Sequence, residues 1–421
     1  MNSELPSARR RQCLAAGLAC LSAAPARAAS AALAGQTVRI AFIDPLSGPA
    51  GDIGRNCLKS WQFMADRLGG AAHPAGLRFR VAGFDNRGSP QASLNALKAA
   101  IDHGFRYIVQ GNGSGVATVL TDAINRHNAN HPDRIVLFIN YAAMDPALTG
   151  ENCSYWHFRI DADTSMKMRA LASYMAGQAQ WRKVYLLNQN DAHGQQFAQY
   201  FKTEMARQSP DVQVVGEELH PLFQLKDFTP QVRRIQASGA QALLTGNWGA
   251  DLLRLVEALQ TQGLGIPVLA YYPSLVGMPT ALARSGERLP VYQVACSHSN
   301  QPGPVAELAT AFRAQHGEDF VVYASYDGLQ MLGRAMADVR STEALPVAAR
   351  LSGLSFQGFN GPVLMRADDH QLQKGVYISR WQKVSALYPR GAEGTAYTFA
   401  PVQYTGGASL GGTPHCGLPR S

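Results

Sequence analysis

Charged residues are scarce in this sequence: Asp, Glu, Lys and Arg make up 16% of 421 residues, with a net charge of +8. After the N-terminal segment the Lys and Arg residues are scattered, and no run of them could follow a phosphate backbone. This distribution argues against a nucleic-acid-binding protein. The same part of the chain lacks any apolar stretch close to the roughly 20 residues that a membrane-spanning helix needs. We therefore expect a soluble protein.

Cysteine is also rare, with six residues and no Cys-x-x-Cys pair. Two of them, Cys13 and Cys20, fall in the N-terminal segment. The remaining four are Cys57, Cys153, Cys296 and Cys416. Four cysteines allow three pairings, and their spacing does not choose among them. An oxidising compartment would favour at least one disulfide.

A metal centre is not expected either. His127 and His131 are four residues apart, a spacing that would align two ligands on a helix. However, Asn128, Asn130 and Pro132 indicate a helix end or a loop at this point. We interpret the two histidines as a solvated surface pair, and the sequence predicts neither a metal nor a cofactor.

The first 28 residues have the organisation of a cleavable export signal. Arg9-Arg10-Arg11 precedes an apolar stretch over 13–24, and Ala26-Arg27-Ala28 supplies a small-x-small cleavage site. The arginine cluster loosely resembles a twin-arginine signal, so this route and the Sec route both remain open. The sequence predicts a periplasmic protein whose mature chain begins near Ala29.

Strand-like and helix-like segments alternate from residue 37 onward. Strands are expected at 37–43, 77–82, 107–109, 134–139, 183–187, 212–215, 242–245 and 267–270. Helices are expected at 53–68, 90–103, 165–178, 194–207, 228–238 and 250–262. Strands that alternate with helices of this length indicate βαβ units. The length and this alternation predict an α/β fold of two doubly wound lobes with parallel sheets.

The glycine-rich segment after the strand at 107–109 matches no catalytic or nucleotide motif. A dinucleotide fingerprint would need Gly-x-Gly-x-x-Gly, but Val116 follows Gly111 and Gly113 at the third position. A hydrolase elbow around Ser114 would need glycines at 112 and 116, which are Asn and Val. We therefore predict no catalytic residue and a protein that is not an enzyme, with an enzyme on a two-lobed scaffold as the alternative from another class.

Candidate binding residues follow the predicted strands, because ligands of such sheets bind at the carboxyl ends of the strands. Gly113 would let a ligand approach the backbone, and Ser114 adds a hydroxyl at a helix N-terminus, which favours an anion; the alternative is a tight turn with Ser114 as N-cap. Other residues at strand ends suit a cleft that stacks on a planar ligand, with ordinary packing as the alternative. They are Tyr141, Ala142, His193, Trp248 and Tyr272.

Several segments, taken in order, resemble the periplasmic branched-chain amino acid-binding proteins, which are ABC-transporter solute-binding proteins of the type I periplasmic-binding fold. The segments are 40–49 (IAFIDPLSGP), Phe84-Asp85, 90–98, 107–111, Phe158-Arg159 and 323–332 (YASYDGLQML). The resemblance covers about 37–385. It implies two lobes that close on a small solute by a hinge motion and then deliver the solute to a membrane permease, with a monomer as the default state.

The resemblance also implies three crossovers between the lobes, near 158–161, 273–278 and 356–361. The N-terminal lobe would then comprise 36–159 and 276–356, and the C-terminal lobe 160–275 and 357–400. We expect the Gly-rich tail over 401–421 to be poorly ordered.

In family members that bind amino acids, individual positions have roles that can be carried over. Ser114 stands where a serine binds the ligand carboxylate, and Ala142 where a backbone group binds the ligand. His193 and Trp248 stand where the family has aromatic residues. Met144 replaces a hydroxyl residue that assists amine binding, and Tyr272 replaces the acidic residue that neutralises the amine.

The last two departures bear on the ligand. A buried ammonium without a carboxylate partner would be costly to desolvate. We therefore hypothesise a solute with an acidic or polar end and no conventional α-amine, such as an aromatic or otherwise planar organic acid. Asp327 or Asp191 could supply the missing charge from elsewhere, so an amino acid or amide receptor with a rearranged amine site remains the alternative.

Overall fold

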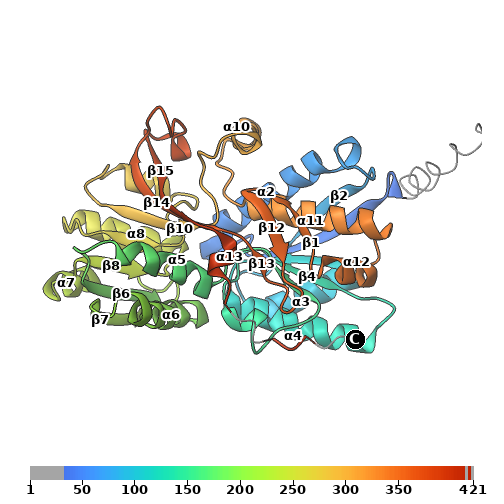
Figure 1. Cartoon of the computed structure of the whole chain (residues 1–421), viewed down its shortest axis with the longest axis horizontal. Helices are drawn as coiled ribbons and strands as arrows, with labels where there is room; N and C mark the ends of the chain where they lie inside the picture. Colours follow the sequence, from blue (N-terminus) through green and yellow to red (C-terminus); the bar gives the residue numbers. More distant parts are fainter. Residues whose placement is uncertain (1–32, 413–415, 419–421) are drawn as a thin grey trace, which may run out of the picture.

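The structure is a computed structural model that describes residues 33–412 and 416–418. The predicted export signal over 1–28 lies outside the described residues. Across the described part of the chain, no helix has the combination of length and apolar character that a membrane crossing requires. Figure 1 shows two α/β lobes side by side, with the chain passing between them more than once.

The N-terminal lobe is built on a five-stranded parallel sheet with the order β2-β1-β3-β4-β5. Its strands are β1 (Thr37–Asp44), β2 (Arg78–Asp85), β3 (Tyr107–Gln110), β4 (Leu137–Asn140) and β5 (His157–Arg159). Its helices are α2 (Gly51–Leu68), α3 (Pro90–Asp102), α4 (Ser114–Asn130), α11 (Ala324–Val339) and α12 (Ala344–Leu351). Ile40 and Phe42 of β1 belong to the core with α2, α11 and α12, whereas Ala41 and Ile43 belong to the core with α3 and α4. Both faces of the sheet are therefore covered, as a parallel sheet requires.

The C-terminal lobe contains a seven-stranded sheet with the order β15-β14-β10-β9-β8-β6-β7. Its strands are β6 (Lys183–Gln189), β7 (Gln213–His220), β8 (Ala242–Thr245), β9 (Val268–Ala270), β10 (Val291–Ala295), β14 (Val376–Lys383) and β15 (Tyr397–Thr405). The helices α5 (Thr164–Ala176) and α6 (Ala192–Gln208) cover one face, and α7 (Thr229–Ala237), α8 (Gly249–Thr261) and α9 (Met278–Ala283) cover the other. β14 pairs antiparallel with both β10 and β15, so this edge departs from the parallel pattern.

Smaller elements complete the N-terminal lobe. A three-stranded sheet consists of β11 (Ser355–Gly358), β12 (Gly361–Met365) and β13 (Leu372–Gln373). Phe356, Val363 and Met365 of this sheet pack into the core beneath α2 and α11. Phe312 of α10 (Pro304–His316) joins the same core.

The lobe boundaries differ from the expected ones at the second and third crossovers. The chain remains in the C-terminal lobe through β10, because β10 extends that sheet by pairing with β9. It therefore returns to the N-terminal lobe after residue 295 and not near 273–278. It leaves again between β13 and β14, and not near 356–361, because β11 and β12 pack into the N-terminal core. The first crossover, from β5 to α5, lies beside the expected 158–161.

The tail also differs from the expectation over its first residues. β15 continues to Thr405, and the short helix α13 (Gly407–Leu410) follows it. Leu410 is fully buried in the core with α5. The chain then reaches the N-terminal lobe, where Cys416 forms a disulfide with Cys153 across a Cα–Cα distance of 5.8 Å. Cys57 and Cys296 are free and buried.

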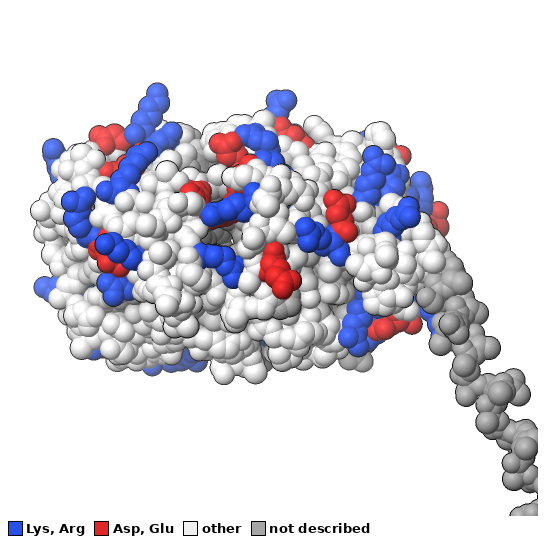
Figure 2. All heavy atoms as spheres, turned by 90° about the horizontal axis from the view of Figure 1, so that it is seen from above, with Lys and Arg blue, Asp and Glu red and all other residues white. Residues whose placement is uncertain are grey.

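The surface charge is dispersed, as the sequence indicates. Figure 2 shows Lys and Arg side chains interspersed with Asp and Glu over the visible face, without a continuous basic stripe. Ion pairs on the protein surface include Lys202 with Glu217 and Arg234 with Glu218.

Candidate functional site

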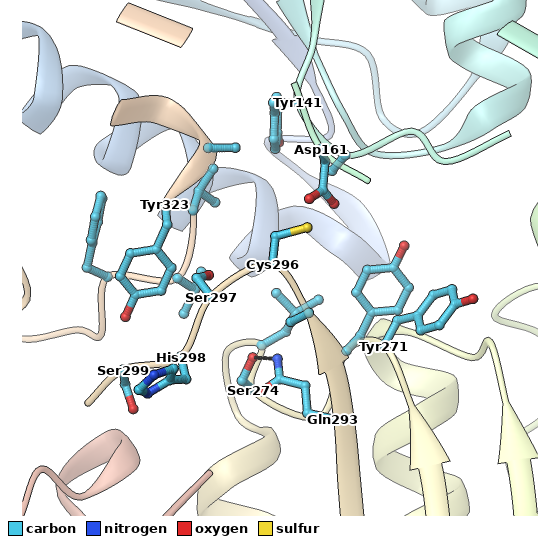
Figure 3. Close-up of a pocket in the computed structure, with 18 of the residues that line it drawn as sticks. Tyr141, Asp161, Tyr271, Ser274, Gln293, Cys296, Ser297, His298, Ser299 and Tyr323 are labelled. Atoms are coloured by element: carbon cyan, nitrogen blue, oxygen red, sulfur yellow. Dashed lines mark hydrogen bonds between the residues drawn. The ribbon is translucent and has the colours of Figure 1, made fainter. Parts of the chain in front are cut away.

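The candidate site is a cavity of about 150 Å³ between the two lobes. The N-terminal lobe lines it with residues from α2, from the segments after β3 and β4, and from the start of α11. The C-terminal lobe lines it with residues from β10 and the segment after β9, and the crossovers supply Asp161, Cys296 and Lys374. Figure 3 shows Cys296 near the centre, with Tyr141 and Asp161 on one side and Ser274 and Gln293 on the other.

On the N-terminal side, a buried carboxylate organises the strand ends. Asp44, at the end of β1, has no exposed surface. It accepts a hydrogen bond of 2.5 Å from the Tyr141 hydroxyl and one of 2.9 Å from the Asn112 backbone N–H. Burial raises the pKa of Asp44 to about 7, although these hydrogen bonds lower it. Tyr141 and Asn112 line the cavity, whereas Asp44 lies behind them.

On the C-terminal side, two tyrosines follow β9 and form an aromatic wall. Tyr271 and Tyr272 line the cavity, and His193 packs behind them with ring centroids 6.0 and 5.8 Å away. The Nε2 atom of His193 lies 3.1 Å from the Gly246 carbonyl oxygen, and burial lowers the pKa of this imidazole. The Tyr271 hydroxyl is buried and has no hydrogen-bond partner among the residues that the structure describes.

Two ion pairs lie at the edge of the cavity where the crossovers pass between the lobes. Lys167 Nζ lies 2.8 Å from Asp161 Oδ2, and Lys374 Nζ lies 2.7 Å from Asp327 Oδ2. Burial opposes ionisation of Asp161, but Lys167 and Lys374 together lower the pKa of this carboxyl. Burial likewise disfavours the Lys374 ammonium, but the neighbouring negative groups raise its pKa, Asp327 most of all.

Arg159 connects the start of the first crossover to the segment between β12 and β13. Its guanidinium is fully buried and donates hydrogen bonds to Gln371 Oε1, to the Asp145 carbonyl, to Thr149 Oγ1 and to Asp163 Oδ2. The Arg159 backbone N–H donates to the His370 carbonyl at 3.0 Å. This residue therefore ties the end of β5 to the segment that precedes β13, outside the cavity.

The structure brings together some of the sequence-predicted residues and not others. Tyr141, Ala142 and Tyr272 line the cavity. Gly113 and Ser114 stand at the N-cap and the first residue of α4, where Gly113 has a φ of 99°, and their neighbour Asn112 lines the cavity in their place.

Four further candidates lie outside the lining. His193 is behind the two tyrosines, as described above. Trp248 packs against Phe223 and against the core of the N-terminal lobe, so it bridges the lobes at another point. Asp327 lies beneath Lys374, and Asp191 caps α6 by accepting a hydrogen bond from the Gly194 N–H.

Sequence reasoning missed the polar residues that come from the crossovers and from α5. Asp161, Cys296 and Lys374 line the cavity after β5, β10 and β13, three strands that the sequence analysis did not predict, and Lys167 lines it from α5. Of these four residues, only Asp161 could have been proposed from the sequence, because it lay in the expected first crossover. Within the residues that the structure describes, no group of three or more His, Cys, Asp or Glu side chains is arranged to hold a metal ion.

Comparison with known proteins gives a consistent result. The family model described as "Periplasmic binding protein" matches residues 37–386. The chain is 28% identical over 408 residues to "Leu/Ile/Val-binding protein homolog 4" of Brucella abortus (strain 2308), with 94% of this chain and 95% of the relative covered.

Two solved structures share the fold. The leucine-, isoleucine-, valine-, threonine- and alanine-binding protein from Brucella ovis, in a closed conformation, has a TM-score of 0.79 at 24% identity, covering 92% of this chain and 100% of that chain. A solute-binding protein of an ABC transporter from Rhodopseudomonas palustris BisB5, in complex with 3,4-dihydroxy benzoic acid, has a TM-score of 0.74 at 17% identity, covering 88% and 98%.

Proposed function

The chain belongs to the periplasmic binding protein family, and from this premise we propose that it is the exported receptor of an ABC importer for a small organic acid without an α-amine. The receptor captures the acid between its lobes by hinge closure and presents it to a membrane permease. It works in the periplasm as a monomer, and it returns its ligand chemically unchanged.

This proposal rests on the observation that the carboxylates around the cavity are already bound to other groups of the protein. The two acidic residues of the lining are both engaged with cations of the chain itself: Asp161 with Lys167, and Asp319 with Arg313. Asp44, behind the lining, is held by Tyr141 and Asn112. An α-ammonium group would therefore be buried without a free counter-charge, which costs several kcal/mol. A carboxylate could instead accept a hydrogen bond from Lys167, which lines the cavity and whose ammonium has two N–H donors besides the one directed at Asp161.

The size and the walls of the cavity favour a planar acid. A cavity of about 150 Å³ is comparable to an engineered cavity of about 150 Å³ that binds benzene. Tyr271, Tyr272 and Tyr141 offer aromatic faces or edges to such a ring. The complex of the Rhodopseudomonas palustris protein with 3,4-dihydroxy benzoic acid supports this ligand class on the same fold.

An amino acid receptor is the second candidate, favoured by the names of the Brucella relatives. In that case Asp161 would exchange its bond with Lys167 for one with the ligand's ammonium. An enzyme would require a reactive group in the cavity. The two thiols of the lining, Cys57 and Cys296, are both buried, and burial raises the pKa of each to about 12, which opposes formation of a nucleophilic thiolate.

A thermal-shift screen of the chain from Ala29 onward tests the proposal. The panel contains benzoate, 4-hydroxybenzoate, 3,4-dihydroxybenzoate, short aliphatic acids, amides and the standard amino acids. A ligand at 100 times its Kd stabilises the protein by about 2.7 kcal/mol. Stabilisation by the acids and not by the amino acids is the expected result. Stabilisation by leucine or another amino acid, without an effect of the acids, would reject the missing-amine argument and leave the receptor function in place.

A further inference from the structure

Lys167 is a buried ammonium with fewer strong acceptors than its charge requires. Only 4% of the residue is exposed, and it lines the cavity. Its Nζ atom contacts Asp161 Oδ2 at 2.8 Å and Met144 Sδ at 2.8 Å, and it lies 5.3 Å from the centre of the Tyr271 ring. A thioether sulfur is a weak acceptor, and an aromatic face is weaker than a carboxylate. Within residues 33–412 and 416–418, one of the three N–H donors of Lys167 thus has a strong acceptor.

Lys374 lines the same cavity and provides an internal comparison. Its Nζ atom donates to Asp327 Oδ2 at 2.7 Å and to the Ile160 carbonyl at 3.3 Å. Asp327 is itself only 1% exposed and accepts a further hydrogen bond from the Phe359 backbone N–H. Lys374 therefore has two oxygen acceptors within the protein, which fits a lysine that holds the third crossover to α11.

We propose that Lys167 binds the carboxylate of the ligand, an inference that rests on the proposed function and locates its acid-binding group. The carboxylate would meet Lys167 on the C-terminal lobe, and not the Ser114 hydroxyl on the N-terminal lobe. Ser114 does not line the cavity, whereas Lys167 does. A charge-assisted hydrogen bond would then replace the contacts of Nζ with the sulfur and the ring.

The thioether of Met144 leaves Lys167 Nζ able to donate a hydrogen bond to a ligand. Met144 follows β4 of the N-terminal lobe, yet its side chain packs in the core of the C-terminal lobe. Its sulfur contacts Lys167 Nζ and lies 3.9 Å from the Tyr272 hydroxyl. A hydroxyl residue at this position would offer Lys167 an oxygen acceptor, but the thioether does not. Met144 therefore contacts both Lys167 and Tyr272, the residue at the second departure.

This position also couples ligand binding to closure of the lobes. Lys167 belongs to α5 and moves with the C-terminal lobe, whereas Asp161 lies in the first crossover. A ligand with its acid on Lys167 and its ring near Tyr141 would contact both lobes. Such a ligand stabilises the closed form by its differential affinity for that form.

The test compares an acid with its neutral amide on matched variants. The probes are 4-hydroxybenzoate and 4-hydroxybenzamide, together with the acid that gives the largest thermal shift in the panel above. Lys167→Met should weaken binding of the acids by roughly 10- to 150-fold, the range for a hydrogen bond to a charged group. Binding of the amide should change by less than about 3-fold, and Lys167→Arg should restore part of the affinity for the acids.

Two further variants control the experiment. Lys202→Met removes the same charge from α6, where Lys202 forms an exposed ion pair with Glu217 of β7, and should leave every affinity unchanged. If Lys167→Met does not fold, Lys167→Met with Asp161→Asn removes the ion pair as a unit and is assayed in its place.

Each outcome decides between the two proposals. Loss of acid binding with retained amide binding supports the inference. Equal binding of the acids by wild type and the Lys167 variant overturns the inference and leaves the proposed function standing. Failure of wild type to bind any acid of the panel overturns both.

Discussion

The Tyr141 hydroxyl donates a hydrogen bond of 2.5 Å to Asp44 Oδ2, which joins the end of β4 to the end of β1 across the intervening β3. This contact fixes the ring of Tyr141 at the edge of the cavity. Gly111 lies beneath the ring, so close that a Cβ atom there would be 2.6 Å from it. The N-terminal wall of the site is therefore set by three strand ends together.

The buried Asp44 should make stability depend on pH in an unusual direction. Its folded pKa of about 7 lies above the ordinary 3.8, so the native state holds a proton that the unfolded state releases between about pH 4 and pH 7. Asp44 thus lowers the free energy of unfolding as the pH rises through this window, at most by about 1.4 kcal/mol per pH unit. Urea titrations should show Asp44→Asn gaining stability relative to wild type across this range. A flat difference between Asp44→Asn and wild type across this range would contradict the assignment.

Substitution of Gly111 should weaken ligand binding through Tyr141. In Gly111→Ala the new methyl group would overlap the tyrosine ring, so the ring must move and the hydrogen bond to Asp44 is lost. Isothermal titration with the tightest-binding acid should give an affinity reduced by about tenfold or more, as for loss of one buried hydrogen bond and its packing. Gly115→Ala is the matched control, because no atom of the described part of the chain lies within 4 Å of a Cβ atom built there. Unchanged affinity in Gly111→Ala would mean that Tyr141 does not shape the site.

Arg159 should be among the most sensitive residues to substitution, although it lies outside the cavity. Arg159→Met would leave Asp163 buried without its cation, and loss of one partner of a buried pair costs about 3–5 kcal/mol. Arg234→Met breaks an exposed pair with Glu218 and should cost no more than about 1 kcal/mol. Chemical denaturation of both variants measures the difference. Similar stabilities would show that the Arg159 network contributes little to folding.

The disulfide between Cys153 and Cys416 should stabilise the protein by restricting the unfolded chain. Its two residues are 263 positions apart, so the bond closes a long loop, and removal of such bonds typically costs about 2–5 kcal/mol. The double variant Cys153→Ser, Cys416→Ser should unfold at a lower temperature than wild type. A reducing agent should lower the Tm of wild type to that of the variant and leave the variant unchanged. A Tm equal to that of oxidised wild type would contradict the prediction.

Much of the fold was predictable, because local sequence carries the periodicity of each element. The expected strand at 242–245 coincides with β8, and the expected helix at 90–103 ends one residue beyond α3. The rule that ligands bind at strand ends pointed to the positions after β4 and β9, and Tyr141, Ala142 and Tyr272 at these positions line the cavity. The family match and the α/β fold agree with the resemblance read from the sequence.

The sequence by itself therefore determined the order and type of the elements, the family, and the set of four cysteines from which a disulfide could form. Only the tertiary structure decided that β10 joins the C-terminal sheet, that Cys153 pairs with Cys416, and that Lys167 and Asp161 meet at the cavity. The physical reason is that periodicity reports the environment of a residue along one element. Which sheet a strand joins, and which side chains share a cavity, depend on packing between residues that are far apart in the chain.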